Sequence, residues 1–276
     1  MKLLTCILTE NGCYKANRTI TPKGVMVHST GADNPNIKRY VQPLDRDVAG
    51  AYEPNRTELL KLLGVNANAN DWNHTAREAC VHAFIGKLAD GSVAACQTLP
   101  WNWRGWHAGT GPSGQSANNT HISFEICEDG LTDLDYFSQV YREAVELTAY
   151  LCKQYALDPL EDGVVICHQE GYRRGVASNH GDVLHWFPKM GKSMDDFRAD
   201  VAAELAPKPE VKPEPEPEKE DGMNYYQTLS EVPEYYRPTV EKLVEAGALK
   251  GTGGGLNVSE DFCRIMTVLD RLGKLD

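Results

Sequence analysis

Apolar residues in this chain form short runs separated by longer segments of helical periodicity. The short runs are rich in β-branched residues and have the length of buried strands. They are VMVHST (25–30), two runs within VHAFIGKLADGSVAACQTL (81–99), HISFEIC (121–127) and GVVICH (163–168). An Asp-Gly dipeptide separates the two runs within 81–99, which predicts a hairpin turn there.

Other segments repeat apolar residues every three or four positions, which predicts helices. The longest is 133–157, and a last helix of the large domain is expected at 193–206, with Ser193 as N-cap and acidic residues in its first turn. The segment TELLKLLG, within the long connection 40–73, predicts a further helix. Because strands and helices alternate, we predict an α/β fold with a mixed central β-sheet flanked by helices.

The composition changes abruptly near residue 206. In APKPEVKPEPEPEKEDG (206–222), proline alternates with glutamate, so backbone donors are missing and the carboxylates repel one another. This segment is predicted to be an acidic, extended linker between a domain at 1–205 and a small module at 223–276. The module carries two expected helices, PTVEKLVEAGAL and SEDFCRIMTVLDRLG, with Ser259 as N-cap of the second.

Bulk composition excludes some classes of function. The formal net charge of the 276 residues is -11, which argues against nucleic acid as a partner. No apolar run has the length of a membrane span, so no membrane insertion is expected. The first residues, MKLLTCILTENG, lack the long apolar region of a signal peptide, which predicts a protein made and folded in the cytoplasm. The eight cysteines form no CxxC pair and are expected to be buried free thiols.

Histidines supply the candidate chemistry. All eight lie between residues 28 and 185, and His28 and His168 end two of the predicted strands. One such histidine is usually structural, but several at strand ends, with carboxylates available, favour a zinc site that leaves one position open for water. Glu125 interrupts an apolar strand, and it faces away from Phe124 and Ile126. We interpret it as a functional carboxylate, the alternative being a partly exposed edge strand.

These pieces occur in an order that resembles a known family. VMVHST, HAFIGKLADGSVAACQTLPWNWRGWHAG, NNTHISFEIC and CHQEG resemble the type 2 N-acetylmuramoyl-L-alanine amidases, whose fold is shared with peptidoglycan recognition proteins, over most of residues 20–200. The resemblance implies that His28 and His168 bind zinc and that Glu125 is the catalytic glutamate. It also implies that His107 lines the substrate groove and that Asn118 and Asn119 match polar residues there. Trp106, with Trp101 and Trp103, is a candidate for packing on sugar rings, or else these residues serve loop or core packing.

The third zinc ligand departs from the family pattern. The segment after His168, QEGYRRGVASNHGDVLHWFPK, is longer than the family's and has no cysteine. We favour Asp182, fourteen residues after His168. His180 then takes the place of the family's lysine and would stabilise the oxyanion; His185 and His180 remain alternative ligands.

The resemblance implies zinc-dependent hydrolysis of the amide between N-acetylmuramic acid and L-alanine in bacterial peptidoglycan, with no organic cofactor. A different class of function, a non-catalytic peptidoglycan-binding protein on the same fold, is the main alternative, and a metallopeptidase is a third. The absence of a signal peptide favours a phage endolysin, which stays in the host cytoplasm until lysis and is then released to the wall. The module at 223–276 resembles half of a surface-layer homology repeat. We expect it to bind the wall or to self-associate, and Met223 raises the hypothesis of a second translation start.

Overall fold

The computed structural model describes residues 1–44, 52–53, 55–75, 77–206, 224–251 and 255–275. The chain divides into two compact units, Met1–Lys208 and Pro209–Asp276, each described here by itself. The predicted linker, 206–222, lies outside the described residues except for Ala206. No helix within the described ranges is both long and apolar enough to cross a membrane.

A seven-stranded mixed sheet forms the centre of the larger unit, in the order β3-β1-β5-β4-β6-β2-β7. The strands are β1 (Leu3–Cys6), β2 (Gly24–Asp33), β3 (Tyr52–Glu53), β4 (Ala83–Lys87), β5 (Val93–Gln97), β6 (His121–Glu128) and β7 (Val165–Cys167). β4, β6, β2 and β7 run parallel to one another, while β4 and β5 form the predicted antiparallel hairpin. The predicted fold class, a mixed sheet flanked by helices, is confirmed.

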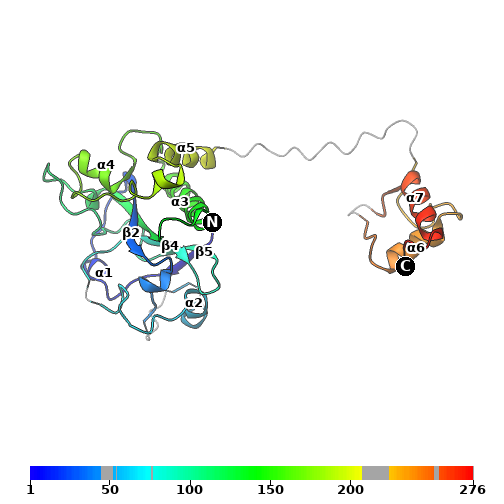
Figure 1. Cartoon of the computed structure of the whole chain (residues 1–276), viewed down its shortest axis with the longest axis horizontal. Coiled ribbons are helices and arrows are strands. Elements are labelled where there is room, and N and C mark those ends of the chain that lie inside the picture. Colours follow the sequence, from blue (N-terminus) through cyan, green and yellow to red (C-terminus); the bar gives the residue numbers. More distant parts are fainter. Residues whose placement is uncertain (45–51, 54, 76, 207–223, 252–254, 276) are drawn as a thin grey trace. The chain divides into compact units, whose positions relative to one another are not determined.

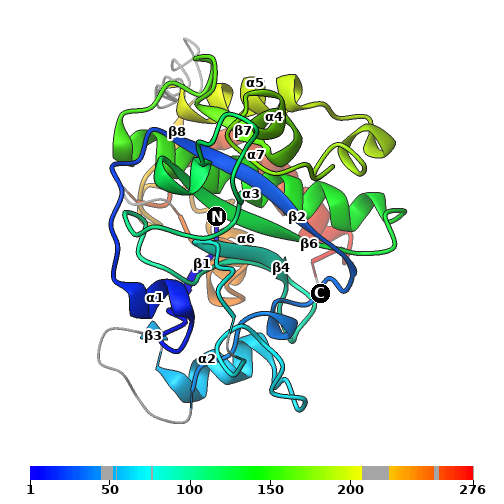
Figure 2. The ribbon, with the colours of Figure 1, turned by 90° about the vertical axis from the view of Figure 1, so that its left-hand side faces the viewer.

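Helices cover both faces of this sheet (Figures 1 and 2). The helices of the unit are α1 (Gly12–Ala16), α2 (Arg56–Leu63), α3 (Leu134–Tyr155), α4 (His168–Arg173) and α5 (Met194–Leu205), with 3-10 turns η1 (Ile37–Arg39), η2 (Ala117–Asn119) and η3 (Phe187–Met190). The main core joins α3 and α5 to one face of the sheet, and a second core joins α2 and η1 to the other. Buried apolar residues therefore line both faces, as parallel sheets require.

Strand alternation decides which side chains turn away from α3. Phe124 and Ile126 lie in the core beneath α3, and so do Val25 and Val27. Side chains alternate along a strand, so Glu125 and His28 project from the opposite face. β6 lies between β4 and β2 in the sheet, which rules out the edge-strand interpretation of Glu125.

The predicted helix starts agree with the structure. Asp133 caps α3, and Ser193 forms a reciprocal capping box with Asp196 at the start of α5. All eight cysteines are buried and free, as expected. One prediction failed by omission, because the N-terminal run at 3–6 forms β1, between β3 and β5 in the sheet.

The smaller unit has little core. It contains β8 (Tyr225–Tyr226) paired with β9 (Val258–Ser259), and the two helices α6 (Arg237–Glu245) and α7 (Glu260–Arg271). Ser259 caps α7 as predicted. The fully enclosed apolar side chains described in this unit are Val232, Val240, Val258 and Cys263.

Candidate metal centre

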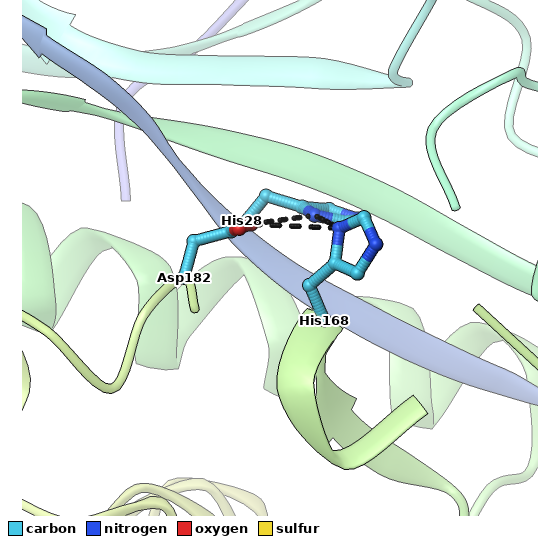
Figure 3. Close-up of side chains that lie close together, drawn as sticks. All are labelled: His28, His168 and Asp182. Atoms are coloured by element: carbon cyan, nitrogen blue, oxygen red, sulfur yellow. Dashed lines mark hydrogen bonds and ion pairs between the residues drawn. The ribbon is translucent and has the colours of Figure 1, made fainter. Parts of the chain in front are cut away.

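Three side chains far apart in the sequence meet beside the sheet. Val27 and Cys167 are register partners on the neighbouring strands β2 and β7. The next residues, His28 and His168, therefore lie at the same level, although His28 was expected to end its strand and instead lies within β2. His168 was expected to end its strand, but the strand ends at Cys167 and His168 is the first residue of α4. Asp182 joins them from the loop between α4 and η3 (Figure 3).

The atoms that meet have the spacing of a metal-binding set. Nδ1 of His28 lies 3.1 Å from Nδ1 of His168 and 3.0 Å from Oδ2 of Asp182, and the third separation, His168 Nδ1 to Asp182 Oδ2, is 3.7 Å. A tetrahedral zinc ion with bonds of about 2.0–2.1 Å holds its donor atoms about 3.3 Å apart. Two imidazole nitrogens and one carboxylate oxygen, with a fourth position left for water, are also a donor set of catalytic zinc sites. The residues present fit the metal that the sequence implied.

The protonation states suit metal binding. Burial lowers the pKa of His168 to about 4, so its imidazole is neutral at pH 7. Burial opposes ionisation of Asp182, but the hydrogen bond from His28 and the charges of His28 and His168 together outweigh it and bring the pKa of the carboxyl down to about 2. Burial also works to lower the pKa of His28, yet the Asp182 carboxylate raises it overall. The Asp182 carboxylate is thus ionised at pH 7 and able to bind a cation.

Glu125 lies next to this group. Its Cα pairs with that of His28 across β6 and β2, so the two side chains share a face. Its Oε2 is buried with no hydrogen-bond partner among the described residues, and burial raises the pKa of the carboxyl to about 8. A buried carboxyl without a partner is costly to keep, and a pKa near the working pH suits a group that takes up and returns a proton.

The two alternative ligands lie differently. His180 is exposed, and its ring centroid is 4.7 Å from that of His168, so it stands at the rim of the centre. His185 bonds instead to buried Glu128, with its Nε2 2.9 Å from Oε1. Glu128 also accepts a bond from the backbone of Gly31. His185 therefore stands outside the group of converging donors.

The predicted groove residues take several roles. His107 Nδ1 lies 3.0 Å from His28 Nε2, so its ring touches a metal-site histidine. Asn118 is buried, and its Oδ1 accepts bonds of 2.8 Å from the backbone N–H groups of His107 and Ala108. Asn119 is exposed and accepts a bond from the Arg104 guanidinium.

The tryptophans divide between packing and exposure. Trp101 is buried in the main core, and Trp103 packs on the small core of Cys13, Cys80 and Leu99. Trp106 is 47% exposed, with Arg104 5.5 Å from its ring centroid. Of the three candidates for packing on a sugar ring, Trp106 alone is exposed.

Two residues near the site carried no signal in the sequence. Ser178 Oγ lies 3.3 Å from His168 Nε2 and donates to the carbonyl of Ala108. His82 is buried, with its Nε2 2.7 Å from the carbonyl of Trp103, and burial lowers its pKa to about 4. A serine in an aperiodic loop and a histidine at a strand start have no pattern that would have marked them.

Comparison with known proteins places this chain in a family. Residues 18–183, more than half of the chain, match the family model described as N-acetylmuramoyl-L-alanine amidase. No curated protein matches the chain. Similar solved structures include the hydrolase AmiA of Staphylococcus aureus in complex with its ligand, which is 18% identical with a TM-score of 0.45 over 68% of this chain and 78% of that one. PlyL is 18% identical with a TM-score of 0.45 over 73% and 96% of the two chains. A mutant endolysin from Bacillus subtilis is 22% identical with a TM-score of 0.39 over 66% and 87%. These structural likenesses are distant, and the assignment rests on the sequence match. The chain belongs to the N-acetylmuramoyl-L-alanine amidase family.

Proposed function

We propose that this protein is a zinc-dependent hydrolase that cuts the amide bond between N-acetylmuramic acid and L-alanine in peptidoglycan. The observation that carries the proposal is the meeting of His28, His168 and Asp182 beside the buried carboxyl of Glu125. The family match independently supports a peptidoglycan amidase. Zinc bound by the three side chains would supply a Lewis acid for the amide carbonyl and would acidify water towards a pKa of roughly 7.

The chain's own residues account for the proton transfers. Glu125, in its ionised form, accepts a proton from the attacking water and returns it to the leaving nitrogen of alanine. His180, at the rim, donates a hydrogen bond to the oxygen on which negative charge develops. The products are a free lactyl carboxylate on the sugar and a free amino terminus on the peptide.

Two substitutions and a chelator test this proposal. Purified protein incubated with peptidoglycan is expected to release new alanine amino termini without new reducing sugars. A chelator, Glu125→Gln and His28→Ala should each abolish this release, and only the chelated wild type should recover with added zinc. Binding of peptidoglycan without cleavage, with zinc present, would instead support the non-catalytic alternative. New amino termini on residues other than alanine would support a metallopeptidase.

We further propose that the smaller unit binds the cell wall. The support is an apolar stripe made of Ile265 and Val268 on α7 and of Leu272 at its C-cap, whose side chains are 56%, 52% and 65% exposed. Their spacing of three and four places them on one face of the helix. With a core as small as this unit's, such a surface gains stability from a partner. Self-association is the competing use of the stripe, and sedimentation with insoluble peptidoglycan beside a measurement of molar mass separates the two.

The lytic role and the location belong to the same proposal. We propose that the protein acts as a phage endolysin, held in the host cytoplasm until lysis and then released to the wall. Purified protein added to cells with an exposed wall is expected to lower their turbidity. Expression inside a host should leave growth unaffected until the membrane is permeabilised. Lysis on expression without permeabilisation would contradict this order of events.

A further inference from the structure

One short segment is linked to both histidines of the metal centre: it contacts His28 directly and His168 through Ser178. We name this segment, Trp106 to Gly109, the strap. Trp106 fixes one end by exchanging two backbone hydrogen bonds of 3.0 Å with Cys80. In the middle, Oδ1 of Asn118 accepts hydrogen bonds from the backbone N–H groups of His107 and Ala108. The strap is thus held by its backbone, independently of the metal-site side chains.

The strap reaches His28 through the ring of His107. Nδ1 of His28 faces Asp182 and His168, and Nε2, on the other side of the ring, lies 3.0 Å from His107 Nδ1. A neutral imidazole that offers Nδ1 to a metal carries its proton on Nε2. That N–H then donates to His107 Nδ1, which must present a lone pair.

The strap reaches His168 through Ser178. Nδ1 of His168 again faces the other donors, and Nε2 lies 3.3 Å from Ser178 Oγ. Ser178 in turn donates two hydrogen bonds to the carbonyl oxygen of Ala108, one from its hydroxyl at 3.1 Å and one from its backbone N–H at 2.8 Å. Ser178 approaches so closely that a Cβ on Gly109 would come within 2.9 Å of its Oγ, and Gly109 has φ +65°. Both features favour glycine at that position.

The two histidines therefore show the same pattern. Each directs Nδ1 to the shared donor group, and each directs Nε2 to an acceptor that the strap holds. We infer that the strap is the outer support of the metal centre, and that His107 and Ser178 are positioning residues that select the Nε2–H tautomer of His28 and His168. This assigns His107 a role different from groove lining. The inference rests on the proposed function, because it concerns the zinc that the function requires.

Zinc affinity measured by competition with a chelating dye tests the inference on the full chain. His107→Leu removes the acceptor and is expected to weaken zinc binding by about 10- to 100-fold. His107→Asn places an amide oxygen near the position of Nδ1 and should restore affinity to within about threefold. Ser178→Ala should weaken binding less, because its bond to His168 is longer. His121→Leu is the matched control, since His121 is a buried histidine that bonds to Thr120 and Gly163 and not to the centre.

The failure of this inference is distinguishable from failure of the proposed function. If wild type binds no zinc, or if His28→Ala binds it equally well, the proposed function is wrong. If His28→Ala loses zinc while His107→Leu binds like wild type, the strap does not support the centre and this inference alone falls. Imidazole ¹⁵N spectra of the zinc-loaded wild type test the premise that both histidines bind zinc through Nδ1. Protons on Nδ1 of His28 and His168 in place of Nε2 would overturn the inference.

Discussion

The two units of this chain depart in opposite ways from the rule that polar groups face water and apolar groups face the core. The larger unit buries polar atoms that have no hydrogen-bond partner among its described residues, such as Oε2 of Glu125 and Nε2 of His107. The smaller unit exposes aliphatic side chains on α7. Buried polar groups cost stability, and clustered exposed apolar groups mark binding surfaces. This contrast is what we expect if the larger unit carries the proposed chemistry and the smaller unit the proposed attachment.

Asp182→Ala is the substitution expected to have the largest effect on the larger unit. It removes the only carboxylate among the three converging donors, and activity should fall roughly a thousandfold or more, to the level of chelated protein. Zinc content measured on the same sample should fall with it. His185→Ala is the comparison, because His185 bonds to Glu128 and lies outside the donor group. Zinc retained by Asp182→Ala and lost by His185→Ala would reverse our assignment of the third ligand.

Glu125→Gln is expected to separate chemistry from metal binding. The amide fills the same space but cannot take up a proton, so the rate of cleavage should fall about 10²- to 10⁴-fold. Zinc affinity should change little, because Glu125 is not one of the converging donors. Loss of zinc from this variant, measured by metal analysis, would mean that Glu125 supports the centre instead of moving protons.

The same substitution predicts a change in stability with pH in the metal-free protein. The pKa of Glu125 is raised in the fold from 4.5 to about 8, so between these values the native state binds more protons than the unfolded chain. The free energy of unfolding therefore falls as pH rises from about 5 to 8. Glu125→Gln lacks this decrease. The difference in unfolding free energy between this variant and wild type should therefore grow in favour of the variant, by on the order of a few kcal/mol, as pH rises from about 5 to 8. Urea denaturation of both chelated proteins at pH 5 and pH 8 measures it. Parallel curves for the two proteins would show that Glu125 is not buried as described.

Most helices of the chain could be predicted from the sequence, but not every strand of the sheet. Periodicity and capping residues predicted α3, α5 and α7 to within a few residues, because local preferences and burial agree there. The strand β1 was missed, since four residues at a chain start show too little alternation to be distinguished from a loop. Its place in the sheet comes from pairing with β3 and β5, which no local pattern records.

The candidate site was predictable where it lies on strands. Register pairs His28 with Glu125, and it pairs Val27 with Cys167, the residue before His168. Alternation along β6 gave the facing of Glu125. The choice among Asp182, His180 and His185 stayed open, because all three lie in one aperiodic segment whose path depends on tertiary contacts. The supporting role of the strap could not be predicted for the same reason. Ser178 and Asn118 hold it through hydrogen bonds to backbone atoms that are not close to them in the sequence.

Polar substitutions in the apolar stripe should change stability least among these variants and still weaken binding of the chain to peptidoglycan. Val268→Ser and Leu272→Ser lie on exposed positions, where substitutions shift unfolding free energy by about 0.5 kcal/mol or less. The pair should weaken sedimentation of the full chain with insoluble peptidoglycan and leave cleavage of soluble fragments unchanged. Val65→Ser is the matched control, because Val65 is 64% exposed in the larger unit. If the double variant loses self-association and still sediments with the wall, the stripe joins copies of this chain. If the double variant keeps both self-association and sedimentation with the wall, the exposed aliphatic residues of the stripe are not a binding surface. The smaller unit would then not be explained by attachment.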